Sequence, residues 1–133
     1  DFTIIDDTYN ASPDSMKASI SILKDFEAER KIAVLADMKE LGTDEKILHK
    51  EIGDFINENV KLDAVFTVGE LAKEIIKDIN KDIYTKSFED NESLEKFISG
   101  YLKAGDVCLL KGSNSMRLFD VVDKIKNYEK FIR

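Results

Sequence analysis

The chain has 133 residues, a formal net charge of −7, 43% hydrophobic residues and 35% charged residues. This length and composition fit one ordinary globular domain with a real core and argue against intrinsic disorder. The acidic excess argues against general binding to nucleic acid or to an anionic membrane, because both need a surplus of Lys and Arg. The chain has a single Cys and shows neither a bilayer-spanning apolar run nor a secretory signal, so we expect a cytoplasmic protein.

Apolar runs and helical patterns alternate along the whole chain. Strands are predicted at residues 2–6, 31–37, 63–68, 82–86 and 106–111, and helices at residues 13–28, 44–59, 70–79, 90–100 and 116–131. Runs without polar alternation are typical of strands covered on both faces. We therefore expect an α/β fold: a Rossmann-like, three-layer, doubly wound and mostly parallel sheet of five to six strands with helices on both faces. No linker or repeat is visible, so residues 1–133 are predicted to form a single domain.

The first polar cluster, residues 6–15, lies between the first strand and the first helix. Ser12 fits an N-cap, and Pro13 fits the first helical position, where its missing N–H costs nothing. A capped turn alone would explain much of this segment. Asp6 and Asp7, however, repel each other at the end of a buried strand, so they need a cation, a ribose hydroxyl or a hydrogen-bond network nearby.

Two further clusters follow predicted strands, at residues 37–42 and 111–117. The carboxyl ends of parallel strands share one edge of a sheet, so all three clusters could line one crevice, where α/β sheets bind ligands. The third cluster combines Lys111, hydroxyl groups and helix N-terminal amides, a set that suits a carboxylate or a phosphate. A glycine turn with Ser caps is the plain structural alternative.

Several common site signatures are absent. The sequence has no G-x-G-x-x-G dinucleotide fingerprint and no G-x-x-x-x-G-K-(S/T) phosphate loop. His49 is the only His, and no second His or nearby Cys could join it at a metal, so a structural or surface role is favoured over catalysis. Cys108 lies in an apolar run and is interpreted as a buried hydrophobic residue rather than a reactive thiol.

The clusters, taken in order, resemble the C-terminal domain of the Mur ligases. Residues 6–18 are similar to the pattern D-D-(S/T)-Y-N-A-(N/S)-P-D-S-M-K-A that opens this domain, and residues 34–42 to V-L-G-D-M-x-E-L-G. His49 and Gly53 match a downstream H-x-x-x-G, and residues 67–69 and 109–113 match two later segments. Three residues depart from the family pattern: Ala36 for Gly, Asn114 for Arg and Phe119 for Glu. The last two bear on the substrate contacts of the third cluster.

The resemblance implies an ATP-dependent ligase of peptidoglycan synthesis. Such a ligase joins D-alanyl-D-alanine to the tripeptide of a UDP-linked muropeptide. The chain, which begins Asp1-Phe2-Thr3, would be the C-terminal domain of a larger three-domain ligase. The N-terminal and central domains, which the sequence lacks, would hold the UDP portion, the phosphates of ATP and Mg²⁺. This domain would close over the central one to shield the acyl phosphate from water.

The resemblance also implies roles for individual residues. Asp7, Tyr9 and Asn10 are expected to bind the nucleotide, with Asp7 accepting hydrogen bonds from ribose hydroxyls. The residues expected to bind the incoming substrate are Asp37, Lys111, Ser113 and Asn114. No catalytic residue and no metal ligand is assigned, so the 133-residue chain alone is expected to be inactive.

Two other classes remain open. A phosphoacceptor receiver domain has a similar length, an acid pair after its first strand and a Lys after its last. Its acceptor follows the third strand, however, whereas here Asp37 follows the second strand and Asp63 starts the third. The second alternative class is a stand-alone nucleotide-binding module of Rossmann type.

Overall fold

The computed structural model describes residues 1–125 and the backbone of residues 131–132. Its strands are β1 (Thr3–Asp7), β2 (Arg30–Ala36), β3 (Ala64–Val68), β4 (Tyr84–Phe88), β5 (Asp106–Lys111) and the short β6 (Phe131–Ile132). Its α-helices are α1 (Pro13–Asp25), α2 (Glu45–Asn59), α3 (Lys73–Ile76), α4 (Asn91–Tyr101) and α5 (Leu118–Ile125), with 3₁₀ turns η1 (Gly42–Asp44) and η2 (Asn114–Met116).

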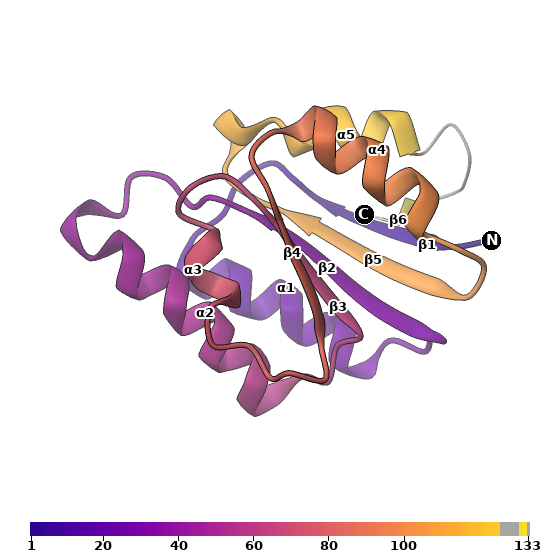
Figure 1. Cartoon of the computed structure of the whole chain (residues 1–133), viewed down its shortest axis with the longest axis horizontal. Helices are drawn as coiled ribbons and strands as arrows, with labels where there is room; N and C mark the ends of the chain where they lie inside the picture. The colour runs from indigo at the N-terminus through magenta and orange to yellow at the C-terminus, as the bar shows by residue number, and fades with distance from the viewer. Residues whose placement is uncertain (126–130, 133) are drawn as a thin grey trace.

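All strand pairs are parallel, and the sheet order is β4-β3-β2-β5-β1-β6. Helices α1 to α3 cover one face and α4 and α5 the other, so the sheet is the middle of three layers (Figure 1). Successive residues of each inner strand enter opposite cores: Ile4 packs with α4 and α5, and Ile5 with α1 and α2. The predicted α/β fold with a parallel, doubly covered sheet is confirmed.

Most observed boundaries lie within three residues of the expected ones, and the differences at three elements have identifiable reasons. The helix expected at residues 70–79 is confined to α3, with turns on either side. The strand expected at residues 82–86 begins two residues later, because Tyr84 pairs with Ala64, the first residue of β3. Of the helix expected at 116–131, α5 is observed, residues 126–130 lie outside the described part of the chain, and Phe131 belongs to β6 instead.

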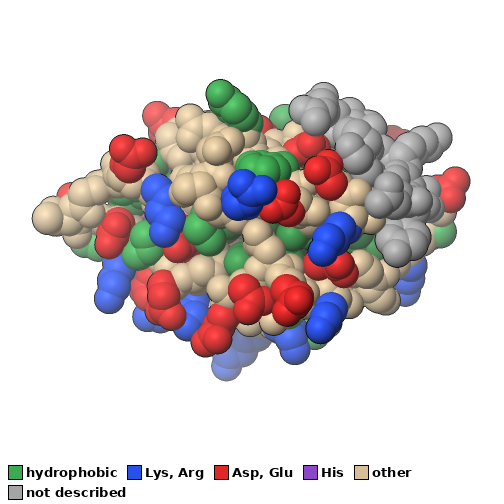
Figure 2. All heavy atoms as spheres, turned by 90° about the horizontal axis from the view of Figure 1, so that it is seen from above, with side chains coloured by type: hydrophobic (Ala, Val, Ile, Leu, Met, Phe, Trp, Pro, Cys, Tyr) green, Lys and Arg blue, Asp and Glu red, His purple; other side chains and the backbone are tan. Residues whose placement is uncertain are grey.

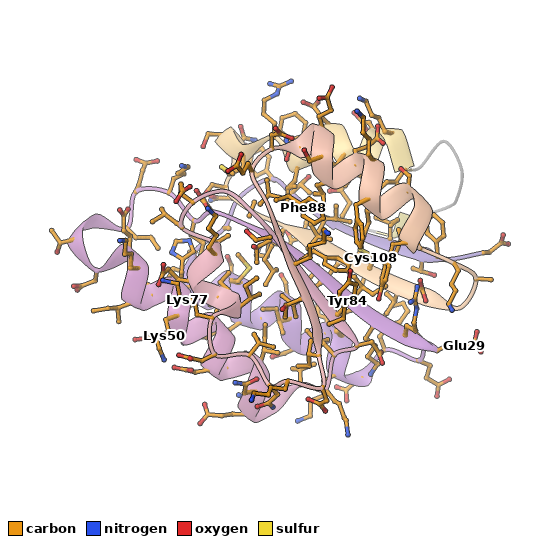
Figure 3. All side chains as sticks on the ribbon, viewed as in Figure 1. Glu29, Lys50, Lys77, Tyr84, Phe88 and Cys108 are labelled. Atoms are coloured by element: carbon orange, nitrogen blue, oxygen red, sulfur yellow. The ribbon has the colours of Figure 1, made fainter. Side chains whose placement is uncertain are left out.

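Aromatic side chains fill the layer between β3, β4 and α4. The Phe66 ring meets those of Phe97 and Tyr101 edge-on, with centroids 5.0 Å apart in both cases. In Figure 3, Tyr84 and Phe88 lie along β4, and Cys108 lies within the layers. Burial raises the pKa of the Cys108 thiol well above its usual range, so Cys108 is the buried hydrophobic residue expected.

Within the described residues, no helix is long and apolar enough to cross a membrane.

Close packing of α2 on α3 explains why position 53, the glycine of the H-x-x-x-G match, carries no side chain. A Cβ added to Gly53 would overlap the backbone carbonyl oxygen of Ile75, which cannot swing away as a side chain could. We expect Gly53→Ala to lower the free energy of unfolding by about 2 kcal/mol, the usual cost of overpacking. The matched control is Gly100→Ala in α4, where nothing lies within 4 Å; it should instead stabilise the chain by about 0.5–1 kcal/mol. Urea unfolding of both variants measures the difference, and equal effects would contradict the packing argument.

Candidate functional site

The three polar clusters lie on the same edge of the sheet. Strands β1, β5 and β2 are neighbours, and Lys111 at the end of β5 pairs with Asp7 on one side and Leu35 on the other. The loops that follow these strands carry the three clusters. The prediction that the clusters share the carboxyl edge is confirmed.

The first cluster is held together by a buried cation. Lys111 Nζ donates to Asp7 Oδ2 over 2.9 Å and to the backbone oxygen of Asn10 over 3.0 Å, and its side chain is only 3% exposed. The Ser19 hydroxyl of α1 also donates to Asp7 Oδ2. On the opposite face of β1, Asp6 Oδ1 accepts hydrogen bonds from Thr8 Oγ1 (2.7 Å) and from the Thr8 N–H (3.3 Å). The neighbouring acids therefore have the cation and the network that their repulsion demands.

Asp37, in the second cluster, is buried and bonded within the protein. Its Oδ1 accepts the Ala72 N–H over 2.7 Å, and its Oδ2 lies 3.4 Å from Lys39 Nζ. The carboxylate occupies the space beside Gly69, where a Cβ would overlap it and where the backbone has a φ of +106° that favours glycine. Asp37 thus ties the end of β2 to the turn between β3 and α3.

Ser113 joins the third cluster to the second. Its N–H donates to the carbonyl of Asp37 over 3.1 Å, and its Oγ accepts the Lys39 N–H over 2.8 Å. Asn114, the next residue, is exposed at the start of η2. The structure therefore brings together all seven residues predicted for the site, but three of them, Asp37, Lys111 and Ser113, are largely buried and bonded to neighbouring loops.

His49 lies on α2 beneath the second cluster and is fully buried. Its Nδ1 donates to the Glu45 carbonyl over 2.6 Å, and its Nε2 accepts the Met38 N–H over 2.9 Å. One donor and one acceptor define the neutral ring with its proton on Nδ1. The structural role favoured for His49 is confirmed: the ring fixes the turn after β2.

A pocket of about 360 Å³ opens beside the first cluster. It is lined by Asp6, Asp7, Thr8, Tyr9 and Phe119. Tyr9 is 80% exposed. Phe119 was not predicted as a site residue; its departure from the family pattern was the only signal in the sequence.

Backbone strain also collects at this edge. Glu40 and Arg117 are the non-glycine residues with positive φ in the described part of the chain, at 61° and 55°. A positive φ costs a non-glycine residue free energy, which the surrounding structure must offset. Such residues concentrate at ligand sites. Arg117 follows η2, pairs with Asp120 over 2.9 Å and lies 5.0 Å from the centre of the Phe119 ring. The Arg117 guanidinium group therefore contacts a ring that lines the pocket.

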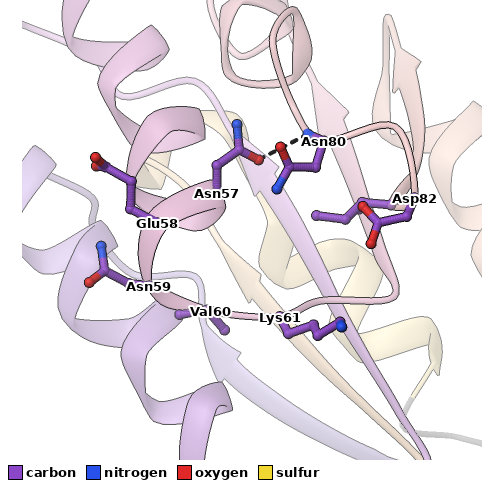
Figure 4. Close-up of a pocket in the computed structure, with 8 residues that line it drawn as sticks. Asn57, Glu58, Asn59, Val60, Lys61, Asn80 and Asp82 are labelled. Atoms are coloured by element: carbon purple, nitrogen blue, oxygen red, sulfur yellow. Dashed lines mark hydrogen bonds between the residues drawn. The ribbon is translucent and has the colours of Figure 1, made fainter.

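The other surface features lie away from the three clusters. A second pocket, of about 340 Å³, lies at the end of α2 and the turn before β4, where Asn57 Oδ1 accepts the Asn80 N–H over 2.9 Å (Figure 4). It is remote from the three clusters, at the amino edge of the sheet. Acidic and basic side chains are interspersed on the face over α4 and α5 (Figure 2). Among the described residues, no group of His, Cys, Asp or Glu side chains could hold a metal ion.

The fold and this edge define a class of protein. An open parallel α/β sheet covered by helices on both faces is a Rossmann-like domain, and its polar loops and pocket lie at the carboxyl edge, where such domains bind ligands. The strand order differs from the 2-1-3-4-5 order of receiver domains, and Asp63 lies before β3, at the opposite edge. The receiver alternative therefore loses its structural basis.

Comparison with known families then narrows the class. The family model described as "Mur ligase, glutamate ligase domain" matches residues 1–114. The chain belongs to the Mur ligase family and corresponds to its C-terminal domain.

Two of the similar curated relatives carry the same name. The UDP-N-acetylmuramoyl-tripeptide–D-alanyl-D-alanine ligases of Bacillus subtilis and Haemophilus influenzae are 38% and 37% identical over 90% and 93% of this chain. The chain spans 27% of the length of each. A crystal structure of MurF ligase from Thermotoga maritima in complex with ADP is 37% identical, with a TM-score of 0.77 over 95% of this chain and 28% of that one.

Proposed function

We propose that this chain is the C-terminal domain of a three-domain, ATP-dependent ligase that adds D-alanyl-D-alanine to a UDP-N-acetylmuramoyl-tripeptide. The observation that carries the proposal is similarity along nearly the whole chain to ligases of that name, combined with three family motifs meeting at one edge of the sheet. The rest of the ligase would hold Mg²⁺ and the phosphates of ATP.

Asp7, Tyr9 and Asn10 are the proposed nucleotide contacts. Asp7 and Tyr9 line the pocket at the carboxyl edge. The Asp7 carboxylate is 40% exposed, so a ribose hydroxyl could donate to it while Lys111 and Ser19 hold it in place. The exposed ring of Tyr9 offers a flat apolar surface to a base. ADP in the similar Thermotoga maritima structure supports a nucleotide as the ligand of this family.

The joined second and third clusters are the proposed site for the incoming dipeptide. Ser113 connects these clusters through two hydrogen bonds, and Asn114 is exposed beside it. Asp37 would act mainly by shaping this surface, because its carboxylate is buried and bonded to Ala72 and Lys39. When this edge faces the central domain, it would complete the site and exclude water from the acyl phosphate.

A chimeric ligase tests the proposed function. This chain would replace the corresponding segment of the Bacillus subtilis relative, and release of ADP would be measured with and without D-alanyl-D-alanine. We expect turnover that requires both the dipeptide and the UDP-linked tripeptide. An inactive chimera, beside an active parent ligase of the same stability, would contradict the proposal.

Tyr9 provides a test of the nucleotide contacts, because its exposure separates binding from folding. Loss of base stacking costs about 1–3 kcal/mol, so Tyr9→Ala should raise KM for ATP by roughly 5- to 100-fold. The free energy of unfolding should change by less than about 0.5 kcal/mol, as for other exposed residues. The control is Ile22→Ala, a change at a 53% exposed side chain of α1, which should alter neither quantity. An unchanged KM for ATP in Tyr9→Ala would remove Tyr9 from the site.

A further inference from the structure

We infer that Lys111 is a positioning residue for the nucleotide loop, residues 7–10, rather than a contact for the carboxylate of the dipeptide. This inference rests on the proposed function and refines the role that the sequence suggested for Lys111. It follows from the burial of the side chain and from the two acceptors that its ammonium group contacts.

A dissolved carboxylate could reach Lys111 only by opening the protein. The side chain is 3% exposed, and Nζ points to Asp7 Oδ2 at 2.9 Å and to the Asn10 carbonyl at 3.0 Å. A buried ammonium group that loses such partners pays a large desolvation cost. The dipeptide would have to compete with an internal carboxylate already in place.

The two acceptors lie at opposite ends of the same loop. Asp7 is the last residue of β1, and Asn10 closes the turn that leads to Ala11 and the N-cap Ser12. One ammonium group therefore fixes both ends, and Tyr9 lies between them with its ring exposed. Lys111 would set the position of the two proposed nucleotide contacts without touching the nucleotide itself.

A second anchor acts on the same carboxylate from the other side. The Ser19 hydroxyl of α1 donates to Asp7 Oδ2, the oxygen that also accepts from Lys111. Strand β5 and helix α1 thus hold Asp7 together. Loosening either anchor should disturb the nucleotide contacts and leave the surface around Ser113 and Asn114 intact.

The test is a comparison of KM for the two substrates in the chimeric ligase. Lys111→Met keeps the unbranched stem of the side chain and removes its ammonium group. We expect KM for ATP to rise by roughly tenfold or more, the effect of losing a hydrogen bond to a charged group, with KM for D-alanyl-D-alanine nearly unchanged. Lys81→Met, a change at an exposed Lys in the turn before β4, is the matched control and should alter neither constant.

Three results would overturn the inference: a rise in KM for the dipeptide alone, equal rises for both substrates, or a lower melting temperature with both constants unchanged. If Lys111→Met does not fold, Ser19→Ala is measured instead. This change removes the hydrogen bond from Ser19 to Asp7 and retains the ion pair between Lys111 and Asp7. Its KM for ATP should rise while that for the dipeptide stays constant, and the reverse pattern would overturn the inference.

Inactivity of the unmutated chimera would count against the proposed function and not against the role of Lys111. In that case the 133-residue chain supplies the readout, through its backbone amide NMR spectrum. Lys111→Met should shift the amide signals of Tyr9 and Asn10 and leave those of Lys39 and Asn114 in place. Unchanged signals from residues 7–10 would overturn the inference.

Discussion

Replacing Arg30 with Met is expected to lower the free energy of unfolding by about 2–3 kcal/mol, because it leaves a buried carboxylate without its cation. Arg30 donates Nε–H to Asp106 Oδ1 over 2.8 Å and Nη2–H to Oδ2 over 2.6 Å. The Asp106 side chain is completely buried. The guanidinium group also donates to the Tyr101 carbonyl and lies 4.3 Å from the centre of the Tyr101 ring. The pair therefore joins the start of β2 to α4 and β5.

Thermal unfolding measures this loss, which should appear as a fall in melting temperature of roughly 10 °C for a domain of this size. Lys50→Met is the control, since Lys50 lies 3.5 Å from Asp54 and 3.3 Å from Asp78 with all three side chains about half exposed or more (Figure 3). Exposed pairs contribute little, so less than about 0.5 kcal/mol should be lost. Equal losses in the two variants would show that burial of Asp106 does not matter.

The pH dependence has a definite sign. The hydrogen bond that Arg30 donates to Asp106 raises the pKa of Arg30 above its ordinary value. A group with a raised pKa stabilises the fold fully below its unfolded-state pKa, and this stabilisation is lost only as the pH rises through the folded-state pKa. The titration of Arg30 should therefore leave its contribution to stability constant between about pH 6 and pH 9.

The fold could be predicted because its sheet is covered on both faces. Residues of β2 and β3 are apolar at successive positions, since both neighbours in sequence face a helical layer. Short elements were harder to place. Helix α3 has only four residues, and the edge strand β4 is half polar, so its limits depend on pairing with β3 rather than on its own pattern.

The placement of the three clusters at one edge of the sheet could also be predicted, but the partners of their side chains could not. Parallel strands bring their carboxyl ends to one edge whatever the loops contain. Which polar group meets which depends on contacts between distant residues, such as Lys111 with Asp7 and Asp37 with Ala72. Lys is rarely buried, so a Lys after a strand is naturally expected to face solvent and a ligand.

The Lys111–Asp7 pair should show an asymmetric response to mutation in the 133-residue chain. Asp7→Ala leaves a 3% exposed ammonium group that still donates to the Asn10 carbonyl, whereas Lys111→Met leaves a carboxylate that is 40% exposed to water and still bonded to Ser19. We expect losses of about 3 kcal/mol for Asp7→Ala and about 1–2 kcal/mol for Lys111→Met. The more exposed partner is thus the more costly one to remove.

The double variant decides whether the buried charge causes this asymmetry. Once Lys111 is Met, no buried ammonium group remains to be stranded, so the double variant should be more stable than Asp7→Ala alone. This requires a coupling energy larger than the loss in Lys111→Met alone, about 2–3 kcal/mol. Urea unfolding of the four proteins measures this cycle. The same cycle on Arg117 and Asp120, a 2.9 Å pair with side chains 64% and 47% exposed, should give a coupling below about 0.5 kcal/mol. Additive losses at Asp7 and Lys111 would mean that water or a shifted loop satisfies Lys111 when Asp7 is absent, and the rigid anchoring of residues 7–10 would then be wrong.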